Sequence, residues 1–235
     1  MRCIRKGDSP EALIKWKFAN RTTPENLVYG GGQFPSASIL QHLVREQRGI
    51  CAYTMLRITP STSHIEHLKP QSECNRTDAE RTAAGQEPLR EDIFWKNMLG
   101  CHPESNSAKA KFGAHIKDDW WDQTKFVSPL REDCESRITF DRDGVAKGAD
   151  DHANKTIDVL SLNHPTLVEM RAGAIKMAGV HPRSGSPLRA AQTARLIAAY
   201  KNYQGENLPE FVQAIIHAAE QHLVWLEKVS RRNSA

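Results

Sequence analysis

Two stretches, SHIEHLKPQS at residues 63–72 and FWKNMLGCHPESNSAKAK at residues 94–111, carry the side chains that decide how this sequence is interpreted. The first reads as a short strand, in which successive side chains point to opposite faces. His64 and Glu66 would then share one face, and His67 would lie on the other. A neutral imidazole can take a proton from water near pH 7, and a carboxylate can hold a divalent cation. The cluster therefore has the parts needed for metal-assisted hydrolysis.

The surrounding sequence has the periodicity of a mainly helical protein. Residues 36–48 read as a helix that ends at Gly49, and an apolar stripe over residues 208–226 predicts an amphipathic helix. A pair of helices is expected on either side of Asn163-His164-Pro165. Asp143-Gly144, which lies between short apolar pieces, predicts a hairpin turn.

The middle of the chain differs from its ends. Short strands are expected at residues 50–56 and 63–68, and a helix at residues 106–112. The stretch from Gln71 to Glu91 is rich in charge, Thr, Ala and Gly, and it reads as an inserted surface loop. Three regions follow: an N-terminal helical segment at 1–48, a core at 49–120 with an inserted loop at about 71–92, and a mainly helical C-terminal region at 121–235 that packs on the core.

Composition excludes several classes of protein. The 235 residues are 39% hydrophobic and 26% charged, which is ordinary for a globular protein, and no apolar run is long enough to span a membrane. The N-terminus is basic without a continuous apolar segment, so a secretory signal is not expected. Five cysteines with no CxxC pair indicate reduced thiols in a cytoplasmic protein. A net charge of +4 permits a polyanionic partner without requiring one.

The order of the key residues resembles a known nuclease family. A histidine next to an acid, an asparagine after an aromatic residue and then Asn-x-x-Lys resemble the motif of HNH endonucleases, a ββα-metal finger. Four further segments are similar to PtuB-like subunits of Septu-type anti-phage systems, including those associated with retrons. These segments are CAY at 51–53, IEHLKPQS at 65–72, FVSPL at 126–130, and TIDVLSLN at 156–163 with Arg171 after it. The similarity covers roughly residues 48–180 and implies an α+β, mainly helical fold, with a small ββα finger flanked by N- and C-terminal helices.

The resemblance implies a role for each residue of the finger. His67 would be the general base that removes a proton from the attacking water. Glu66 and Asn106 would hold one Mg²⁺ or Mn²⁺ ion. Asn97 would form local hydrogen bonds that keep the His67 loop in place. The structural alternatives are that Asn97 caps a turn and that Asn106 is a helix N-cap.

Other polar residues of the finger are candidates for supporting roles. Lys109 and Lys111 are candidate phosphate contacts, and the alternative for both is a solvated surface charge. His64 is either a supporting residue, as an orienter or a further ligand, or a purely structural histidine. Ten histidines in the chain make chance pairs of histidines common.

The cysteines depart from the family pattern. Many relatives carry a CxxC before the finger and a second Cys pair near its end, and these together hold a structural Zn²⁺. Here Thr54 stands three residues after Cys51, and Ser105 stands where a partner of Cys101 would be expected. Two thiolates do not close a tetrahedral site, so structural zinc is not expected. The other side chains that could substitute are Cys74 and His102.

The resemblance also implies an activity and partners. It predicts a metal-dependent hydrolase of phosphodiester bonds, acting on DNA, or on RNA such as tRNA, as effector subunit of a bacterial anti-phage defence complex. It implies a PtuA-like ATPase partner and a retron reverse transcriptase with its RNA and DNA, in the cytoplasm and with no membrane. No P-loop GxxxxGK[ST] occurs in the sequence, so ATP binding by this chain is not expected.

The alternative is a catalytically degenerate HNH-fold adaptor that binds nucleic acid or the ATPase partner without cutting. The missing Cys pair favours the adaptor. The enzyme is favoured because Glu66, His67, Asn97 and Asn106 all keep the chemical types that catalysis needs.

Overall fold

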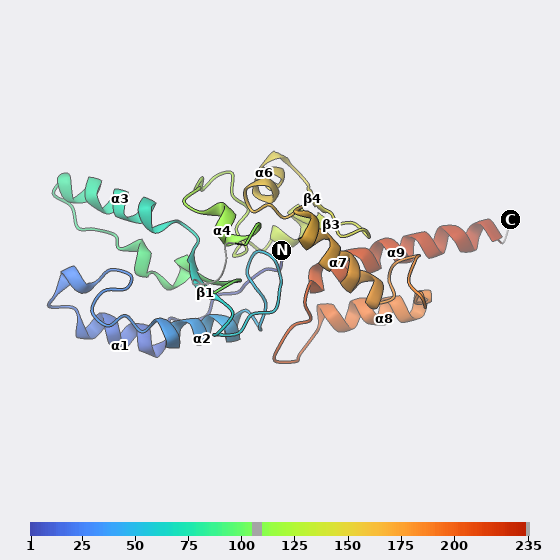
Figure 1. The fold of residues 1–235 in the computed structure, drawn as a ribbon, viewed down its shortest axis with the longest axis horizontal. Coiled ribbons are helices and arrows are strands. Elements are labelled where there is room, and N and C mark those ends of the chain that lie inside the picture. The colour runs from blue at the N-terminus through green and yellow to red at the C-terminus, as the bar shows by residue number, and fades with distance from the viewer. Residues whose placement is uncertain (105–109, 234–235) are drawn as a thin grey trace.

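The computed structural model describes residues 1–104 and 110–233, and the backbone alone at residue 233. Over these residues the fold is mainly helical α+β, with nine α-helices and two small antiparallel two-stranded sheets. The molecule is elongated, with α1, α2 and α3 at one end and α8 and α9 at the other (Figure 1). The helices are α1 (Glu11–Ala19), α2 (Ser36–Glu46), α3 (Gln71–Ala83), α4 (Ala114–Lys117), α5 (Cys134–Arg137), α6 (Asp151–Val159), α7 (Pro165–Met177), α8 (Ala190–Lys201) and α9 (Val212–Asn233). The strands are β1 (His64–His67), β2 (Met98–Cys101), β3 (Ile138–Phe140) and β4 (Ala146–Gly148), and the 3₁₀ turns are η1 (Pro24–Asn26), η2 (Glu91–Ile93) and η3 (Trp95–Asn97).

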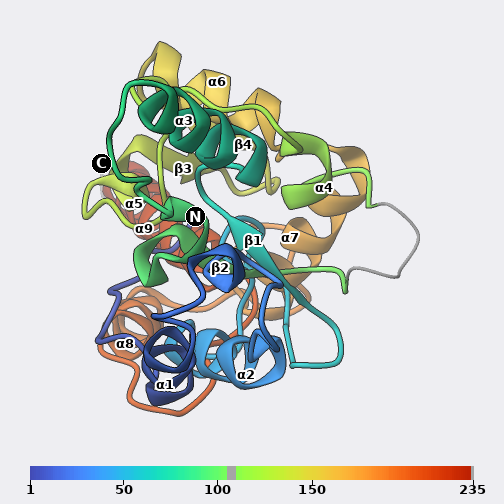
Figure 2. The ribbon, with the colours of Figure 1, turned by 90° about the vertical axis from the view of Figure 1, so that its left-hand side faces the viewer.

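The strand expected at residues 63–68 is confirmed as β1, which pairs antiparallel with β2. His64 lies opposite Cys101, Glu66 opposite Leu99 and His67 opposite Met98. All four residues of β2 are buried. This burial matters because a two-stranded hairpin is marginal in water and needs packing on one face. Figure 2 shows the hairpin between α3 above and α1 and α2 below.

The N-terminal helices supply much of that packing. The helix expected at residues 36–48 is confirmed as α2. It ends earlier than expected, at Glu46 with Gln47 as its C-cap, and the chain then turns through left-handed residues at Arg48 (φ +55°) and Gly49 (φ +71°). One apolar cluster joins α1 and α2 to the segment that leads into β2. Its buried members are Leu13, Trp16, Ile39, Leu43, Ile93, Trp95 and Met98.

The prediction of a strand at residues 50–56 is wrong, because these residues form a turn. An isolated bridge joins Ile50 to Arg57, and between them the chain forms a tight turn in which Cys51 N–H donates to Leu56 O at 2.8 Å. Met55 has a φ of +62°. The apolar run is buried because this turn lies inside the main core. A short apolar run does not by itself distinguish a buried strand from a buried turn.

The surface loop expected at about 71–92 is wrong over its first half, which forms helix α3. This helix buries Cys74 and has little further apolar surface, so no hydrophobic periodicity marks it. It is stabilised instead by pairs along its exposed face: Arg76 contacts Glu73 and Glu80, both at 2.6 Å. The helix expected at residues 106–112 does not form over 110–112, and its earlier residues lie outside the described part of the chain.

The C-terminal region follows the sequence more closely. The hairpin turn at Asp143-Gly144 is confirmed between β3 and β4, with Gly144 at a φ of +84°. Helices α6 and α7 are separated at residues 160–164, as expected. The apolar stripe becomes α9, which begins at Val212 and packs along α8. Within the described ranges, no helix is long and apolar enough to cross a membrane.

His217 on α9 predicts how this region responds to acid. Its ring stacks on Phe140 at 6.0 Å, and Phe140 N–H donates to its Nδ1 at 3.2 Å. Burial lowers the pKa of His217 from 6.5 to about 4. The unfolded chain therefore binds a proton that the fold excludes, so stability falls as pH drops from 6.5 to about 4, by about 3 kcal/mol.

Urea unfolding of the wild type and of His217→Gln at about pH 7.5 and about pH 4.5 checks this expectation. The wild type should lose about 3 kcal/mol more than the variant over this interval, because glutamine does not titrate. Equal losses in the two proteins would show that His217 titrates normally in the fold.

Candidate functional site

His67, the predicted general base, closes β1 with its ring turned into the protein. The residue is 7% exposed, and its Nε2 lies 2.8 Å from the main-chain oxygen of Asp92. Because a carbonyl only accepts, the proton sits on Nε2 and the lone pair is left on Nδ1. Burial lowers the pKa of His67, although the Asp92 carbonyl opposes this effect. The imidazole is therefore held neutral, in a single tautomer, which is the form a base requires.

Sequence reasoning missed two residues that hold this ring, Tyr29 and Asp92. The Tyr29 ring packs edge-on against His67 with centroids 4.6 Å apart. Tyr29 N–H donates to Oδ2 of Asp92 at 2.7 Å, so Asp92 contacts Tyr29 through its side chain and His67 through its main chain. The three glycines at 30–32 mark the loop that carries Tyr29. Nothing in the sequence links that loop to the histidine.

Glu66, the predicted metal ligand, is paired with a lysine that the sequence did not indicate. Nζ of Lys117 lies 3.1 Å from Oε1 of Glu66 and 3.2 Å from the main-chain oxygen of His67. The Lys117 side chain is fully buried, and that of Glu66 is 15% exposed. The Lys117 ammonium therefore contacts both residues of the Glu66–His67 dyad, the predicted metal ligand and the predicted general base.

His64 lies on the same side of the hairpin as Glu66. Its Nε2 is 3.8 Å from Oε2 of Glu66, which is beyond hydrogen-bond distance. Its Nδ1 is hydrogen-bonded to the main-chain oxygen of Pro103, and its ring centroid lies 5.4 Å from that of His115. Burial alone would lower the pKa of His64, but the Glu66 carboxylate and the Pro103 carbonyl outweigh it and raise the pKa. The Glu66 carboxylate and the Pro103 carbonyl thus stabilise the protonated form of His64.

Asn97 fastens the end of the hairpin. Its Oδ1 accepts from Lys69 N–H at 2.7 Å, and its Nδ2 donates to the main-chain oxygens of Lys69 and Glu91, both at 3.0 Å. Leu68 N–H also donates to Asn97 O at 2.9 Å. These bonds close the segment between β1 and β2 at its base, directly after His67.

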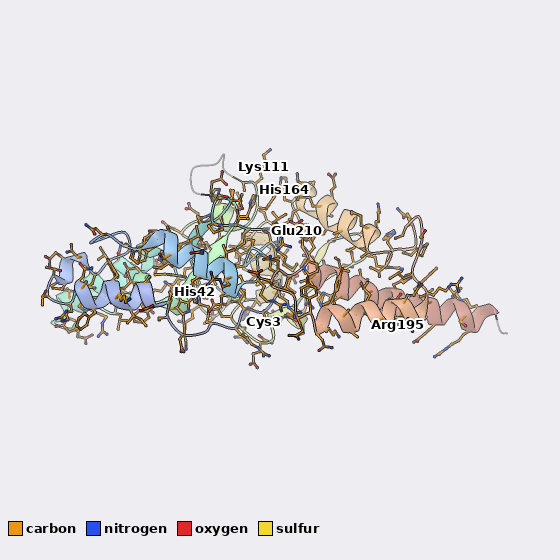
Figure 3. The ribbon with its side chains drawn as sticks, turned by 90° about the horizontal axis from the view of Figure 1, so that it is seen from below. Cys3, His42, Lys111, His164, Arg195 and Glu210 are labelled. Carbon is orange, nitrogen blue, oxygen red and sulfur yellow. The ribbon has the colours of Figure 1, made fainter. Side chains whose placement is uncertain are left out.

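The remaining predicted residues of the finger are only partly placed. Asn106 and Lys109 lie outside the described residues. Lys111 is exposed at the outer edge of the molecule, where Figure 3 labels it close to His164. The ring of its neighbour Phe112 lies 5.7 Å from the ring of His164. An exposed lysine in this position can contact a phosphate.

Cys51 and Cys101 lie against each other in the main core. Burial raises the pKa of the Cys51 thiol, but hydrogen bonds from Cys101, Thr54 and His102 N–H outweigh it and lower the pKa to about 5. Burial and the bond to Cys51 raise the pKa of Cys101 well above its ordinary value. The thiolate of Cys51 is thus stabilised by hydrogen donors, and two sulfurs do not make a tetrahedral zinc set.

The fit of a Mg²⁺ or Mn²⁺ ion can be tested on Glu66. A carboxylate oxygen is the ligand type that these ions prefer, and Oε2 faces away from Lys117 toward His64. Across the part of the chain that the structure covers, no three His, Cys, Asp or Glu side chains form a group that could hold a metal ion. Glu66 therefore fits as one ligand, already neutralised by a lysine, and the described residues do not complete the site.

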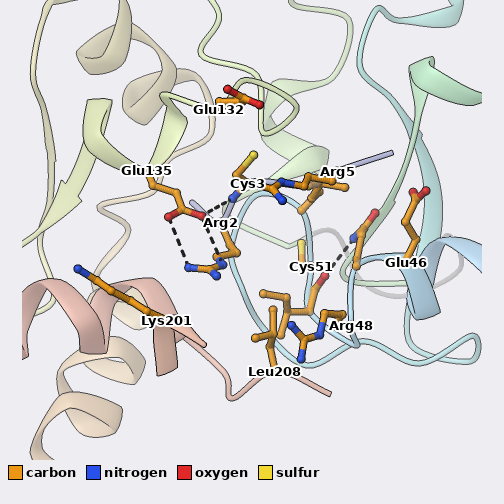
Figure 4. Close-up of a pocket in the computed structure, with 14 residues that line it drawn as sticks. Arg2, Cys3, Arg5, Glu46, Arg48, Cys51, Glu132, Glu135, Lys201 and Leu208 are labelled. Carbon is orange, nitrogen blue, oxygen red and sulfur yellow. Dashed lines mark hydrogen bonds and ion pairs between the residues drawn. The ribbon is translucent and has the colours of Figure 1, made fainter. Parts of the chain in front are cut away.

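A separate pocket of about 480 Å³ opens between the N-terminal segment, the end of α2 and α8 (Figure 4). Its basic side chains are Arg2, Arg5, Arg48 and Lys201, and its acidic ones are Glu46, Glu132 and Glu135. Arg2 pairs with Glu135 at 3.3 Å. Glu66 and His67 do not line this pocket, so it is distinct from the hairpin site.

Any functional assignment rests on the residues of this chain, because comparison with known proteins supplies no relative. A scan against protein-family models and a search of curated proteins both found no match to this chain.

Replacing Asn97 should destabilise the fold. Asn97→Ala removes three hydrogen bonds to main-chain groups of Lys69 and Glu91 and should lower the free energy of unfolding by about 2–3 kcal/mol. Lys96→Ala, at the exposed neighbouring position, should change it by less than about 0.5 kcal/mol. Urea unfolding of the two variants checks this, and equal effects would show that Asn97 does not fasten the hairpin.

Proposed function

We propose that this protein is an HNH-type nuclease that hydrolyses phosphodiester bonds of nucleic acid, as effector subunit of a bacterial anti-phage defence complex. The observation that supports the proposal is the β1–β2 hairpin. It places a neutral histidine of fixed tautomer next to a carboxylate, and an asparagine fastens its base. In this proposal the hairpin, with the chain that follows it, is the ββα finger of the family.

His67 carries the proton-transfer step. Its Nε2–H is held by the Asp92 carbonyl, so Nδ1 would accept the proton of the water that attacks phosphorus. Tyr29 covers the ring and helps to keep it neutral, because the contact excludes solvent. Asn97 contributes indirectly, by holding the chain on both sides of the hairpin end. Lys111, and Lys109 outside the described residues, would contact phosphates of the substrate.

Glu66 would hold one Mg²⁺ or Mn²⁺ ion, together with Asn106 outside the described residues. Such an ion, when bound, supplies positive charge that stabilises the scissile phosphate and the leaving oxygen. His64 would orient Glu66 from the same side of the hairpin. The structure supplies no set of ligands for a structural Zn²⁺ in the residues it describes, and the proposal does not require one.

The proposed partners follow from the same assignment. A PtuA-like ATPase, which the resemblance to PtuB-like subunits implies, would control the nuclease. The sequence itself holds no P-loop. A retron reverse transcriptase with its RNA and DNA would be a further component. The complex would act in the bacterial cytoplasm.

The test is cleavage of plasmid DNA and of total RNA by the purified chain, with Mg²⁺ or Mn²⁺ and with EDTA. His67→Ala should lower the cleavage rate by about 10²–10⁴-fold, because the general base is lost. EDTA should abolish cleavage. The matched control is His152→Ala, which removes an exposed histidine on α6 and should leave the rate unchanged.

Metal-dependent cleavage that survives His67→Ala would contradict the assigned role of this residue. If the chain alone is inactive, the assay is repeated with the ATPase partner co-expressed. Continued inactivity there, with nucleic-acid or ATPase binding retained, would favour the non-catalytic adaptor.

A further inference from the structure

Lys117 is a buried ammonium group placed against both residues of the Glu66–His67 dyad. The residue is 1% exposed, and its Nζ lies within 3.2 Å of a Glu66 carboxylate oxygen and of the His67 carbonyl oxygen. A buried charge is tolerated when it is paired and hydrogen-bonded, and both conditions hold here. Lys117 is therefore a fixed part of the site.

The backbone around α4 sets where this ammonium group lies. Gly113, just before α4, has a φ of +79° and donates to Leu160 O at 2.7 Å. Asp118, just after α4, has a φ of +47°. Trp120 N–H donates to the carbonyl of Lys117 at 2.9 Å. These contacts hold both ends of the short helix, which lies beside the hairpin in Figure 1.

We propose that Lys117 is a tethered counter-ion of Glu66, which competes with a divalent cation for this carboxylate and so sets the cation affinity of the site. The inference rests on the proposed function, because it takes Glu66 as a metal ligand. The ammonium group cancels the charge that would attract a cation and repels a cation on the other carboxylate oxygen. Its tether also gives it a high effective concentration at Glu66. A phosphodiester adds negative charge, so the site favours a cation when nucleic acid is present.

Binding of Mn²⁺ alone, measured by the EPR signal of the free ion, tests the proposal without nucleic acid. Lys117→Met keeps most of the side-chain volume and removes the charge, so it should bind Mn²⁺ at least tenfold more tightly than the wild type. Glu66→Gln in the Lys117→Met background should remove the whole gain. Lys96→Met, which removes an exposed charge near the hairpin, should leave the affinity within twofold of the wild type.

Unchanged or weaker Mn²⁺ binding by folded Lys117→Met would overturn the proposal, as would a gain that persists with Glu66→Gln. Cleavage by the wild type together with unchanged Mn²⁺ affinity in the variant would reject this inference and leave the nuclease standing. Tighter Mn²⁺ binding by Lys117→Met without cleavage in any assay would support this inference and reject the nuclease.

A measurement on the wild type covers the case in which Lys117→Met does not fold. Mn²⁺ that displaces the ammonium group should make Lys117 more reactive toward acetic anhydride. Mass spectrometry should then show at least a threefold rise in acetylation of Lys117 at saturating Mn²⁺, relative to the exposed Lys96. Acetylation of Lys117 that stays constant or falls would overturn the proposal.

Discussion

The site depends on how the chain between β1 and β2 is closed. Asn97 makes three side-chain hydrogen bonds to Lys69 and Glu91, and its carbonyl extends the strand ladder to Leu68. A four-residue ladder could not hold this connection by itself. Asn97 also donates to the main-chain oxygen of Glu91 in η2. This contact holds the next residue, Asp92, where its carbonyl oxygen accepts from the His67 ring. The orientation of the His67 ring is thus a consequence of this closure.

Burial of polar groups then makes the site rigid. His67, Asp92 and Lys117 are each less than one-tenth exposed, so each must find partners inside the protein. They find them in one another, in Glu66 and in the main-chain N–H of Tyr29. A change at one position leaves a buried donor, acceptor or charge unpaired at the next, which costs far more than a surface substitution. The polar network thereby specifies one geometry for the dyad.

The sequence predicts the parts of this arrangement that local pattern controls. A short strand-like piece predicted β1, apolar spacing predicted α2, and Asp143-Gly144 predicted the turn between β3 and β4. Helix α3 was not predicted because its stability comes from exposed charge pairs and not from an apolar stripe. Pro70 and Gly85, on either side of it, are the helix start and stop signals that the sequence does contain. The turn at 50–56 was mistaken for a strand because its residues are apolar. They are apolar because the turn is buried in the main core, which a single sequence does not show. The roles of Lys117 and Tyr29 were not predicted because their contacts with the dyad span about 40 to 50 positions in the sequence.

In the proposed nuclease, the pairing of Glu66 with Lys117 changes what the site needs from its substrate. A free carboxylate next to a histidine would attract a divalent cation at all times. A carboxylate that shares a buried ammonium group has little net charge to offer, so a further anion is needed to favour the cation. In the proposed function, the phosphodiester of the substrate is such an anion. Binding of nucleic acid and of the cation would then be coupled, and by reciprocity each would strengthen the other. A nuclease built this way would hold its metal tightly when nucleic acid occupies the site.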